Sequence, residues 1–491
     1  MTQPPEYFPT LASRRPAHRM VRDSSRWRAA DTKRIRTLAA RDFEASPPSS
    51  TLWGAIDSGL RSSSDSARQE FSTDDEDPGT GARSHAATSQ AIRTLRGVCI
   101  LLLLAMHATI PYLAFMKPPT SEFAQSPYTW LAFPIVDAQR WFGFDLFAAW
   151  LDVYLMSLMF FLSGLFIRAS LVGRGTRPLL AARLKRLGAP FVFALVAVMP
   201  VALYPAYRVR AVDPSLPAYV ESYLALPFLP NGPMWFLWML LALTAVIAAI
   251  HRFVPRAAEF IGVFASGAKQ APGRYFLGLA TTATLAYVPL ALAFSPWEWR
   301  EMGPVSFQVS RPALYSVYLL AGYGVGAHGL GNGLLAADGR LATGWSKWLL
   351  VAFASLLLWM GLTGLTLSYT TSAPRSLLVV AEASYAWAGA ASVFFVLAAS
   401  LRLAAFRSRL LDALSHNALG IYVLHYAPLV WLQFAMLDVP LPAVPKALIV
   451  FGGTLGAAFA GAAAFAGAKK GLRSVATRAR MVEQSAPSSI T

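Results

Sequence analysis

Arg96 and His107 are the two residues whose types and spacing point most directly to chemistry. They are eleven residues apart, so on a helix of about 100° per residue they share one face and lie about 16 Å apart along the axis. A guanidinium can bind an anion such as a phosphate. A histidine titrates near neutral pH and can take a proton from a hydroxyl or act as a nucleophile. We therefore expect an anion-binding arginine at one end of a helix and a reactive histidine deeper along it, near mid-membrane.

Asp152, Glu382 and His425 are the other ionisable residues that we single out within long apolar segments. Such groups are costly inside a membrane and usually serve a purpose. Tyr422 and His425 are three residues apart and share a helix face. Asp152 and Glu382 can accept hydrogen bonds from a hydroxyl-rich ligand, or each can pair with a polar group inside the bundle.

The segment Arg168–Gly188 is the most basic loop between apolar segments. Arg183 and Arg186 lie three residues apart on either side of Lys185 and would share a helical face. Paired guanidinium groups suit phosphate recognition. The alternative is that these charges only set the orientation of the chain in a membrane.

The composition excludes an ordinary soluble protein. Of 491 residues, 55% are hydrophobic and 14% are charged, whereas soluble domains have about 25% charged residues. Cys99 is the single cysteine, so the sequence allows no intramolecular disulfide and no cysteine-based zinc site. The seven histidines are scattered, and we expect no metal centre.

Ten long apolar segments follow Arg93, and we expect each to cross a membrane, which takes about 20 apolar residues. The half-apolar stretch Tyr128–Arg140 is expected to be an interfacial or re-entrant piece. The predicted fold class is therefore an all-α, polytopic integral membrane helical bundle of about 10 transmembrane helices. The predicted spans are Gly97–Phe115, Leu146–Ile167, Ala189–Tyr207, Met234–Ile250, Tyr275–Phe294, Pro312–Leu330, Trp348–Leu367, Leu377–Ser400, Asn417–Met436 and Val444–Ala466.

The net charge is +17, and its excess of basic residues lies in every second loop between these segments. Four alternate loops (168–188, 252–274, 331–347 and 401–416) carry 15 basic and 3 acidic residues, whereas the intervening loops are nearly balanced. Cytoplasmic loops of membrane proteins carry the excess of Lys and Arg. We therefore expect a multi-pass protein of the inner (plasma) membrane with both termini in the cytoplasm, and the charge needs no nucleic acid to explain it.

The ends of the chain differ from its apolar body. Residues 1–90 are rich in Ser, Thr, Ala and Arg and have no sustained apolar periodicity, so we expect a disordered cytoplasmic tail. It is not a signal peptide, because no apolar segment follows its early arginines. Residues 91–468 form the predicted membrane domain, and residues 469–491 a basic cytoplasmic C-terminal tail.

Five segments between Arg93 and Ala466 resemble the motifs of the acyltransferase 3 family of bacterial membrane enzymes, and they occur in that family's order. One motif alone would be weak, but five in order are fairly specific. The segments are Arg96–His107 (R-x10-H), Met159–Phe166 (F-F-x-x-S-G-F), Arg183–Leu187 before Pro190 (R-x-x-R), Gly232–Trp238 (W-F-L) and Leu414–His425 (S-x5-I-Y-L-x-H).

The resemblance implies transfer of an acyl group, acetyl or succinyl, from cytoplasmic acyl-CoA to a hydroxyl of a glycan or other acceptor at the outer face. His107 would be the base or a transient acyl carrier, and Arg96 would position the donor. Arg183 and Arg186 would bind the acyl-CoA phosphates. No permanently bound cofactor is expected, and the partners would be acyl-CoA, the acceptor and the lipid bilayer. The residues expected to line the acceptor site or cavity are Asp152, Ser163, Trp235, Glu382, Tyr422 and His425.

A secondary transporter or exporter of an anionic or lipid-linked substrate is the main alternative. Many spans, broken helices and ionisable groups within the membrane fit transport as well. The absence of a visible repeat between the two halves counts modestly against it. A membrane scaffold is a weaker interpretation, because it leaves Arg96 and His107 unexplained.

Overall fold

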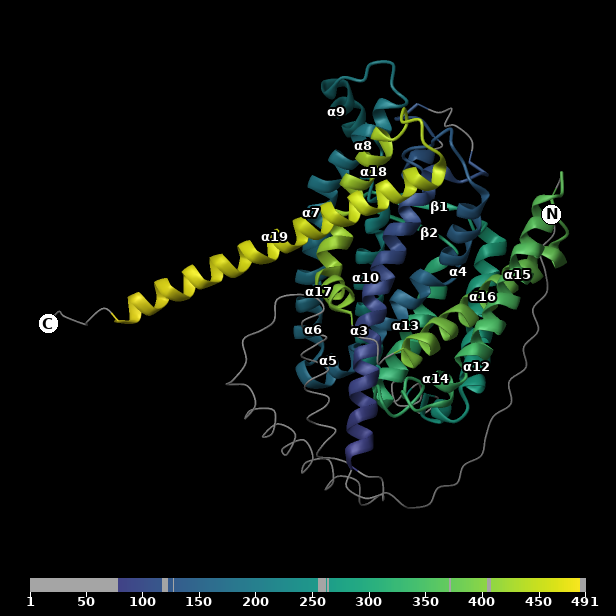
Figure 1. Cartoon of the computed structure of the whole chain (residues 1–491), viewed down its shortest axis with the longest axis vertical. Coiled ribbons are helices and arrows are strands. Elements are labelled where there is room, and N and C mark those ends of the chain that lie inside the picture. The colour runs from purple at the N-terminus through teal and green to yellow at the C-terminus, as the bar shows by residue number, and fades with distance from the viewer. Residues whose placement is uncertain are drawn as a thin grey trace, which may run out of the picture. The chain divides into compact units, whose positions relative to one another are not determined.

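A computed structural model describes residues 78–116, 122–126, 128–254, 262, 265–370, 372–403 and 408–485. These residues form helices and one two-stranded sheet, which confirms the predicted all-α membrane bundle (Figure 1). The expected tail up to residue 77 lies outside the described residues. The helices are α3 (Pro78–Thr109), α4 (Phe142–Gly164), α5 (Ile167–Arg174), α6 (Thr176–Arg183), α7 (Ala189–Phe193), α8 (Met199–Arg208), α9 (Leu216–Leu224), α10 (Trp235–Phe253), α12 (Pro272–Phe294), α13 (Arg311–His328), α14 (Arg340–Thr343), α15 (Trp345–Leu367), α16 (Arg375–Arg402), α17 (Arg409–Leu424), α18 (Tyr426–Ala435) and α19 (Ala443–Ser485); the strands are β1 (Trp299–Met302) and β2 (Val305–Gln308).

Eight helical stretches in the described part of the chain are long and apolar enough to cross a membrane: α3, α4–α5, α6–α8, α10, α12, α15, α16 and α19. The bent pair α17–α18 brings the number to nine. The sequence predicted ten. The difference is α13, which occupies the predicted sixth span but is not among the candidates, since its apolar residues are interrupted by glycines and tyrosines and flanked by Arg311 and His328.

The predicted ninth span is broken and not continuous. Helices α17 and α18 meet at His425 with a bend of 65°. Pro428 has no backbone N–H and therefore cannot donate to the carbonyl of Leu424, where α17 ends. The bend places His425 at a hinge between two helices.

Helix α3 begins earlier than the sequence suggested. Residues 78–90, expected in the tail, are helical, and two of their side chains bind the segment before α15. Ser84 Oγ donates to Asp338 at 3.1 Å, and Thr88 Oγ1 donates to the Leu335 carbonyl at 2.8 Å. These contacts fix the first turns of α3 against the rest of the bundle.

Helices α4 and α13 are in close contact because glycines line their interface. A side-chain carbon on Gly322 would overlap the carbonyl of Phe161, and one on Gly326 would overlap the carbonyl of Leu165. One on Gly164 would likewise overlap the carbonyl of Leu319. Small residues let membrane helices approach closely, so these three glycines allow α13 to pack directly against α4.

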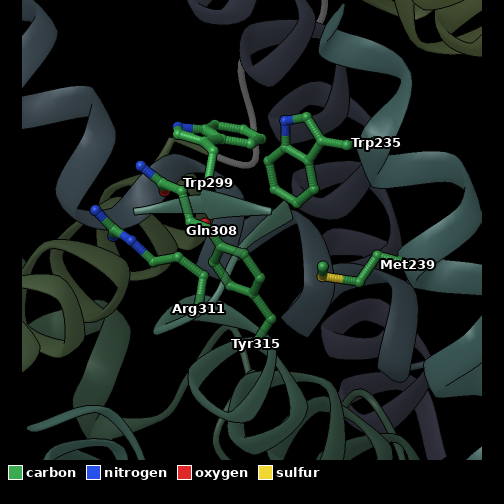
Figure 2. Close-up of a pocket in the computed structure, with 6 residues that line it drawn as sticks. All are labelled: Trp235, Met239, Trp299, Gln308, Arg311 and Tyr315. Atoms are coloured by element: carbon green, nitrogen blue, oxygen red, sulfur yellow. The ribbon is translucent and has the colours of Figure 1, made fainter. Parts of the chain in front are cut away.

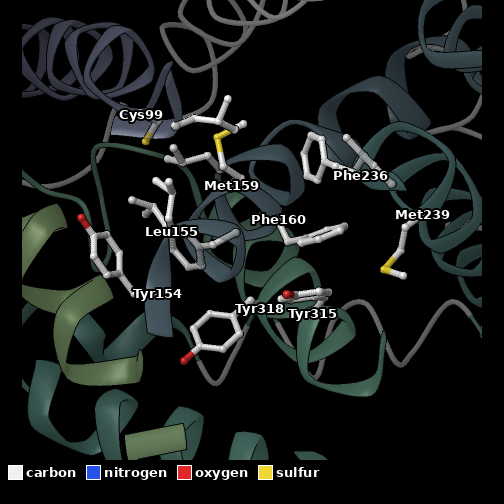
Figure 3. Packing of buried hydrophobic residues seen from close by; sticks show 14 of the residues in the cluster. Cys99, Tyr154, Leu155, Met159, Phe160, Phe236, Met239, Tyr315 and Tyr318 are labelled. Carbon is white, nitrogen blue, oxygen red and sulfur yellow. The ribbon is translucent and has the colours of Figure 1, made fainter. Parts of the chain in front are cut away.

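Aromatic side chains fill the space where α4, α10 and α13 meet. Figure 3 shows Phe160, Phe236 and Tyr315 close together, with Tyr154 and Met159 on the neighbouring turns of α4. The Phe160 and Tyr315 rings stack with centroids 4.8 Å apart. In a bilayer, such van der Waals packing is a main source of helix association, and here it holds α13 against α4.

Helices α12, α15 and α16 lie together in Figure 1, and α17 to α19 gather beside α3. The antiparallel β1–β2 hairpin precedes α13 and turns through Gly303, whose φ is +56°. A glycine at this position of a two-residue turn fits the twist of the flanking strands. Leu229 N donates to the Gly303 carbonyl at 2.9 Å and holds the hairpin on the segment before α10.

The stretch Tyr128–Arg140 is not a span. It contains a short 3-10 turn, Thr129–Leu131, followed by irregular chain. The Trp130 side chain is fully buried, and its indole N–H donates to the Phe123 carbonyl at 2.9 Å. This agrees with the predicted non-spanning piece.

Candidate active site

His107 and His425 lie next to each other although they are more than 300 residues apart in sequence. Their ring centroids are 5.3 Å apart, with the planes at 57°. Tyr422 and Tyr426 flank the pair, with ring centroids 5.8 Å and 6.0 Å from that of His425. The structure therefore brings together three of the residues singled out in the sequence, and Tyr426 is an addition.

The hydrogen bonds of the two imidazoles determine which nitrogen can react. His107 Nδ1 lies 2.8 Å from the Leu103 carbonyl, and His425 Nδ1 lies 2.6 Å from the Tyr422 carbonyl. A carbonyl can only accept, so each Nδ1 carries the proton and each neutral ring leaves Nε2 as an acceptor. His425 is fully buried, and its Nε2 has no hydrogen-bond partner among the described residues.

Two contacts between helices hold the histidine pair in place. A side-chain carbon on Gly97 would lie 2.5 Å from the Leu411 carbonyl, so glycine is what allows α17 to approach α3. Beyond the hinge, Gln433 Nε2 in α18 donates to the His107 carbonyl at 2.8 Å. Helices on both sides of the hinge thus bind α3.

Helix α3 begins well before Gly97, where the predicted span started. His107 therefore lies in the last turns of the candidate span Ser84–Tyr112. Arg96, eleven residues earlier, is nearer to the middle of the same helix.

The three arginines predicted to bind a donor lie on different elements. Arg96 is on α3, Arg183 ends α6, and Arg186 lies between α6 and α7. Arg96 is buried, and its guanidinium lies over the Phe166 ring at 4.8 Å. Arg183 is 6% exposed and makes no hydrogen bond or ion pair with the described residues. Arg186 is half-buried on a π-helical turn, Leu184–Gly188, and lies near enough to Arg183 for their charges to repel.

Asp152 has a partner inside the bundle. Its carboxylate is 3.0 Å from Arg311 Nη2 and also lies near the Tyr385 hydroxyl. Glu382 is half-buried and within electrostatic reach of Arg311 and Tyr287. The second of our two alternatives, pairing with a polar group, therefore holds for Asp152. We did not single out Arg311, although an arginine immediately before an apolar segment is a signal for it.

Ser163 and Trp235 have different surroundings. Ser163 Oγ donates to the carbonyl of Met159 one turn earlier, at 2.8 Å, which is a contact within its own helix. The Trp235 ring stacks on that of Tyr315 with centroids 5.6 Å apart. Trp235 also lines a small pocket between α10, the hairpin and α13, and its ring lies close to that of Trp299 in Figure 2. The other residues that line this pocket are Met239, Gln308, Arg311 and Tyr315.

Lys446 and Asp137 form a further ion pair, in which both side chains are buried. Lys446 Nζ is 2.8 Å from Asp137 Oδ2, and both side chains are 1% exposed. The pair joins α19 to the segment before α4. A lone lysine in an otherwise apolar segment is the sequence signal that identifies one partner.

Arg210, just after α8, also binds the segment before α4 that contains Asp137. Its guanidinium donates to the carbonyls of Pro134 and Ala206 at 2.8 Å and 2.7 Å. Burial lowers the pKa of Arg210 to about 10. Among the residues that the structure describes, no group of His, Cys, Asp and Glu is arranged to hold a metal ion.

Comparison with known proteins agrees with the motifs found in the sequence. The model of the acyltransferase 3 family, described as an acyltransferase domain, matches residues 89–463. This range includes Arg96, His107, the basic segment and the α17–α18 hinge. No curated protein and no solved structure matches the chain. Since the match covers most of the sequence, the chain belongs to the acyltransferase 3 family and is a membrane-embedded acyltransferase.

Proposed function

We propose that the protein transfers an acetyl or succinyl group from cytoplasmic acyl-CoA to a hydroxyl of a glycan or similar acceptor at the outer face of the inner membrane. The observation that carries this proposal is the histidine pair, in which His107 and His425 lie 5.3 Å apart and both leave Nε2 as a proton acceptor. Acyl transfer to an alcohol requires such a base beside the hydroxyl.

Two routes are compatible with this pair, and both begin at His107 Nε2. In the direct route, His107 Nε2 takes the proton of the acceptor hydroxyl while the hydroxyl oxygen attacks the thioester carbonyl. The C–S bond then breaks, and the His107 imidazolium returns the proton to the CoA thiolate. In the covalent route, His107 Nε2 first attacks the thioester carbonyl, the C–S bond breaks, and CoA leaves as the thiolate. His425 Nε2 then takes the proton of the acceptor hydroxyl while the hydroxyl oxygen attacks the acyl carbon, and the bond from that carbon to His107 Nε2 breaks. The close ring contact suits the second route as well as the first.

The arginines are proposed to hold the donor. Acyl-CoA carries phosphates, and guanidinium groups bind phosphates through paired donors. Arg183 is buried without a partner among the described residues, and Arg186 lies beside it, which suits a polyanionic ligand. Arg96, on the same helix as His107, would position the thioester end. The donor then enters from the basic, cytoplasmic side.

The orientation follows from the same charges. Helix α13 packs along α4 and α12, and counting it as a crossing gives ten spans with both termini in the cytoplasm. The acceptor then approaches from the opposite end, where Asp152, Trp235 and Glu382 lie. Ser163 is assigned to helix packing, since it donates within α4.

The proposal is tested in cells by replacing His107 with Ala. Mass spectrometry of the surface glycans should show one acyl mass in cells with the wild-type protein and its loss in the His107→Ala cells, at equal protein levels. Ser163→Ala is the matched control and should keep the acyl mass. Full acylation with His107→Ala would exclude the assignment of His107.

A transporter remains the second candidate because one observation favours it. The α17–α18 pair is a helix broken by 65° with a histidine at the break, and broken helices line substrate sites in secondary transporters. An assay of the purified protein with labelled acyl-CoA and an acceptor distinguishes the enzyme from the transporter. Transfer of the label supports the enzyme, and movement of an intact substrate across a vesicle membrane without transfer supports the transporter.

A further inference from the structure

The two histidines lie where helical segments end. His107 is in the last turn of α3, and His425 is the residue at which α17 gives way to α18 with a bend of 65°. Before the bend, α17 is fixed to α3 by their close approach at Gly97. Beyond the bend, other contacts must fix α18, because the packing of α17 does not determine the direction of the next helix. The position of His425 relative to His107 therefore depends on contacts at both ends.

The chain that follows α3 is held by the segment before α4. Asp137 N donates to the Pro111 carbonyl, and Trp141 N donates to the Tyr112 carbonyl, both at 3.0 Å. The Asp145 carboxylate, in the first turn of α4, accepts from two further backbone N–H groups of this chain, at 2.8 Å and 3.1 Å. The end of α3 and the start of α4 are thus connected by a set of hydrogen bonds.

Lys446 on α19 joins this connected region to the chain just after α18. Lys446 Nζ lies 2.8 Å from Asp137 Oδ2 and donates to the Leu437 carbonyl, two residues after the end of α18, at 3.3 Å. The lysine and aspartate side chains are each 1% exposed. Two buried charges compensate each other only while their geometry is kept. A shift of one region against the other would therefore be opposed by the ion pair.

The neighbours of Lys446 on α19 bring the ammonium within reach of its partner. Ala443 and Ala447 pack in a small apolar cluster with Tyr112 and Phe144. Because alanine side chains are small, they let α19 approach the chain after α3 closely. The apolar packing and the ion pair therefore act on the same junction between α3, α4 and α19.

Both regions that Lys446 joins lie close to the histidine pair in sequence. Pro111, whose carbonyl is held on one side, is four residues after His107. Leu437, whose carbonyl is held on the other side, is four residues after Gln433. Gln433 Nε2 in turn donates to the His107 carbonyl at 2.8 Å. Lys446 therefore connects the chain after His107 with the helix that continues from His425.

From these contacts we infer that Lys446 and Asp137 are positioning residues for acyl transfer, and that their ion pair keeps His107 and His425 in contact. Neither residue is assigned a contact with the reacting atoms. They act by holding the end of α3 and the end of α18 at a fixed separation. A displacement of about 1 Å at a catalytic group can lower a rate about 100-fold. This inference rests on the proposed role of the histidine pair, and it adds the residues that hold the pair.

Kinetics of a variant that lacks both charges test the inference. Lys446→Met combined with Asp137→Asn removes the ion pair without leaving one charge buried alone, so this protein should fold. Inverted membrane vesicles from cells expressing it contain the cell's own acceptors and are given labelled acetyl-CoA or succinyl-CoA. We expect kcat per folded protein to fall about 10- to 100-fold, as expected for a misplaced catalytic group, with the KM for acyl-CoA changed less than about twofold.

The matched control separates positioning from a general loss of stability. Phe394 is fully buried on α16, and its ring lies 4.7 Å from that of Trp348 and 5.4 Å from that of Phe276. Phe394→Leu reduces this packing and should lower Tm. It leaves the Lys446–Asp137 pair intact, so its kcat per folded protein should stay at the wild-type value.

Amide hydrogen exchange gives a second measurement, which needs no substrate. The N–H groups of Asp137 and Trp141 donate to carbonyls of the chain after α3, and exchange reports the local opening of such bonds. Exchange at these two N–H groups should be about tenfold faster or more in the double variant. In Phe394→Leu it should be unchanged.

The outcomes distinguish this inference from the proposed function. A wild-type kcat in the double variant, or an equal loss of kcat in Phe394→Leu, would overturn the positioning role and show that the ion pair only stabilises the fold. Unchanged exchange at Asp137 and Trp141 in the double variant would overturn it as well. If the wild-type protein transfers neither label, the proposed function fails, whereas the exchange measurement still tests the hold of the ion pair on the end of α3.

Discussion

The buried ion pair between Lys446 and Asp137 gives a stability prediction whose size follows from the structure. Both side chains are 1% exposed, and their charged atoms are 2.8 Å apart. The remaining hydrogen-bonding capacity is also used: Lys446 Nζ donates to the Leu437 carbonyl at 3.3 Å, and Asp137 Oδ1 accepts from Gln139 N at 2.8 Å. Removing one partner would leave the other charge buried without compensation.

Lys446→Met removes one charge at nearly constant volume. Breaking a buried pair in this way costs about 3–5 kcal/mol, which is at least a hundredfold change in the unfolding equilibrium. Combining Lys446→Met with Asp137→Asn removes both charges. Since replacing both members of a buried pair by uncharged groups is often nearly neutral, we expect the double variant to recover most of the lost free energy of unfolding.

The assay is thermal unfolding of the purified protein in one detergent, followed by intrinsic fluorescence. The exposed pair Arg300–Glu298 on the hairpin is the control, and Glu298→Gln should cost less than about 1 kcal/mol. Lys446→Met should lower Tm clearly, and the double variant should restore it. If the single and double variants unfold at the same temperature, the two charges do not compensate each other and the reasoning is wrong.

Three further changes test how the histidine pair is held. Gly97→Ala would place a carbon 2.5 Å from the Leu411 carbonyl, so it should lower the free energy of unfolding by about 1–3 kcal/mol and reduce acyl transfer. Gly361→Ala, which has open space around it, is the control and should change neither quantity. Equal behaviour of the two variants would contradict the account. Gln433→Leu removes the hydrogen bond to the His107 carbonyl and should reduce kcat severalfold in a protein that still folds; an unchanged kcat would show that this bond does not position His107. Pro428→Ala supplies the missing backbone donor and should lower activity by straightening the hinge, which a cross-linking distance between α17 and α18 can check; a straightened hinge with full activity would contradict its role.

The parts of the fold that depend on apolar length could be predicted from the sequence. Most spans were correct within several residues, because about 20 apolar residues in a row have few alternatives to a membrane helix. The exceptions have physical reasons. Helix α13 was predicted as a span, but its glycines, its tyrosines and the flanking Arg311 and His328 leave it outside the candidate spans by composition. The hinge at His425 depends on a missing donor at Pro428, a local effect that an apolar average hides.

The candidate site was predictable in its residue types but not in its partners. His107, His425 and Tyr422 were singled out, and the structure places them together. Their contact arises from the close approach of α17 to α3 at Gly97, which has no signal in a single sequence. Asp152 was singled out without Arg311, since a salt bridge between residues 159 positions apart requires the tertiary fold.

The central claim is that His107 and His425 together catalyse acyl transfer. It is tested most directly by single-turnover assays of purified protein in vesicles, with labelled acyl-CoA and a neutral oligosaccharide, measuring label in the product. The wild-type protein should transfer the label, and His107→Ala and His425→Ala should each reduce the rate by about 100-fold or more, as expected when a catalytic base is lost. Wild-type rates in the His107→Ala protein would contradict the claim.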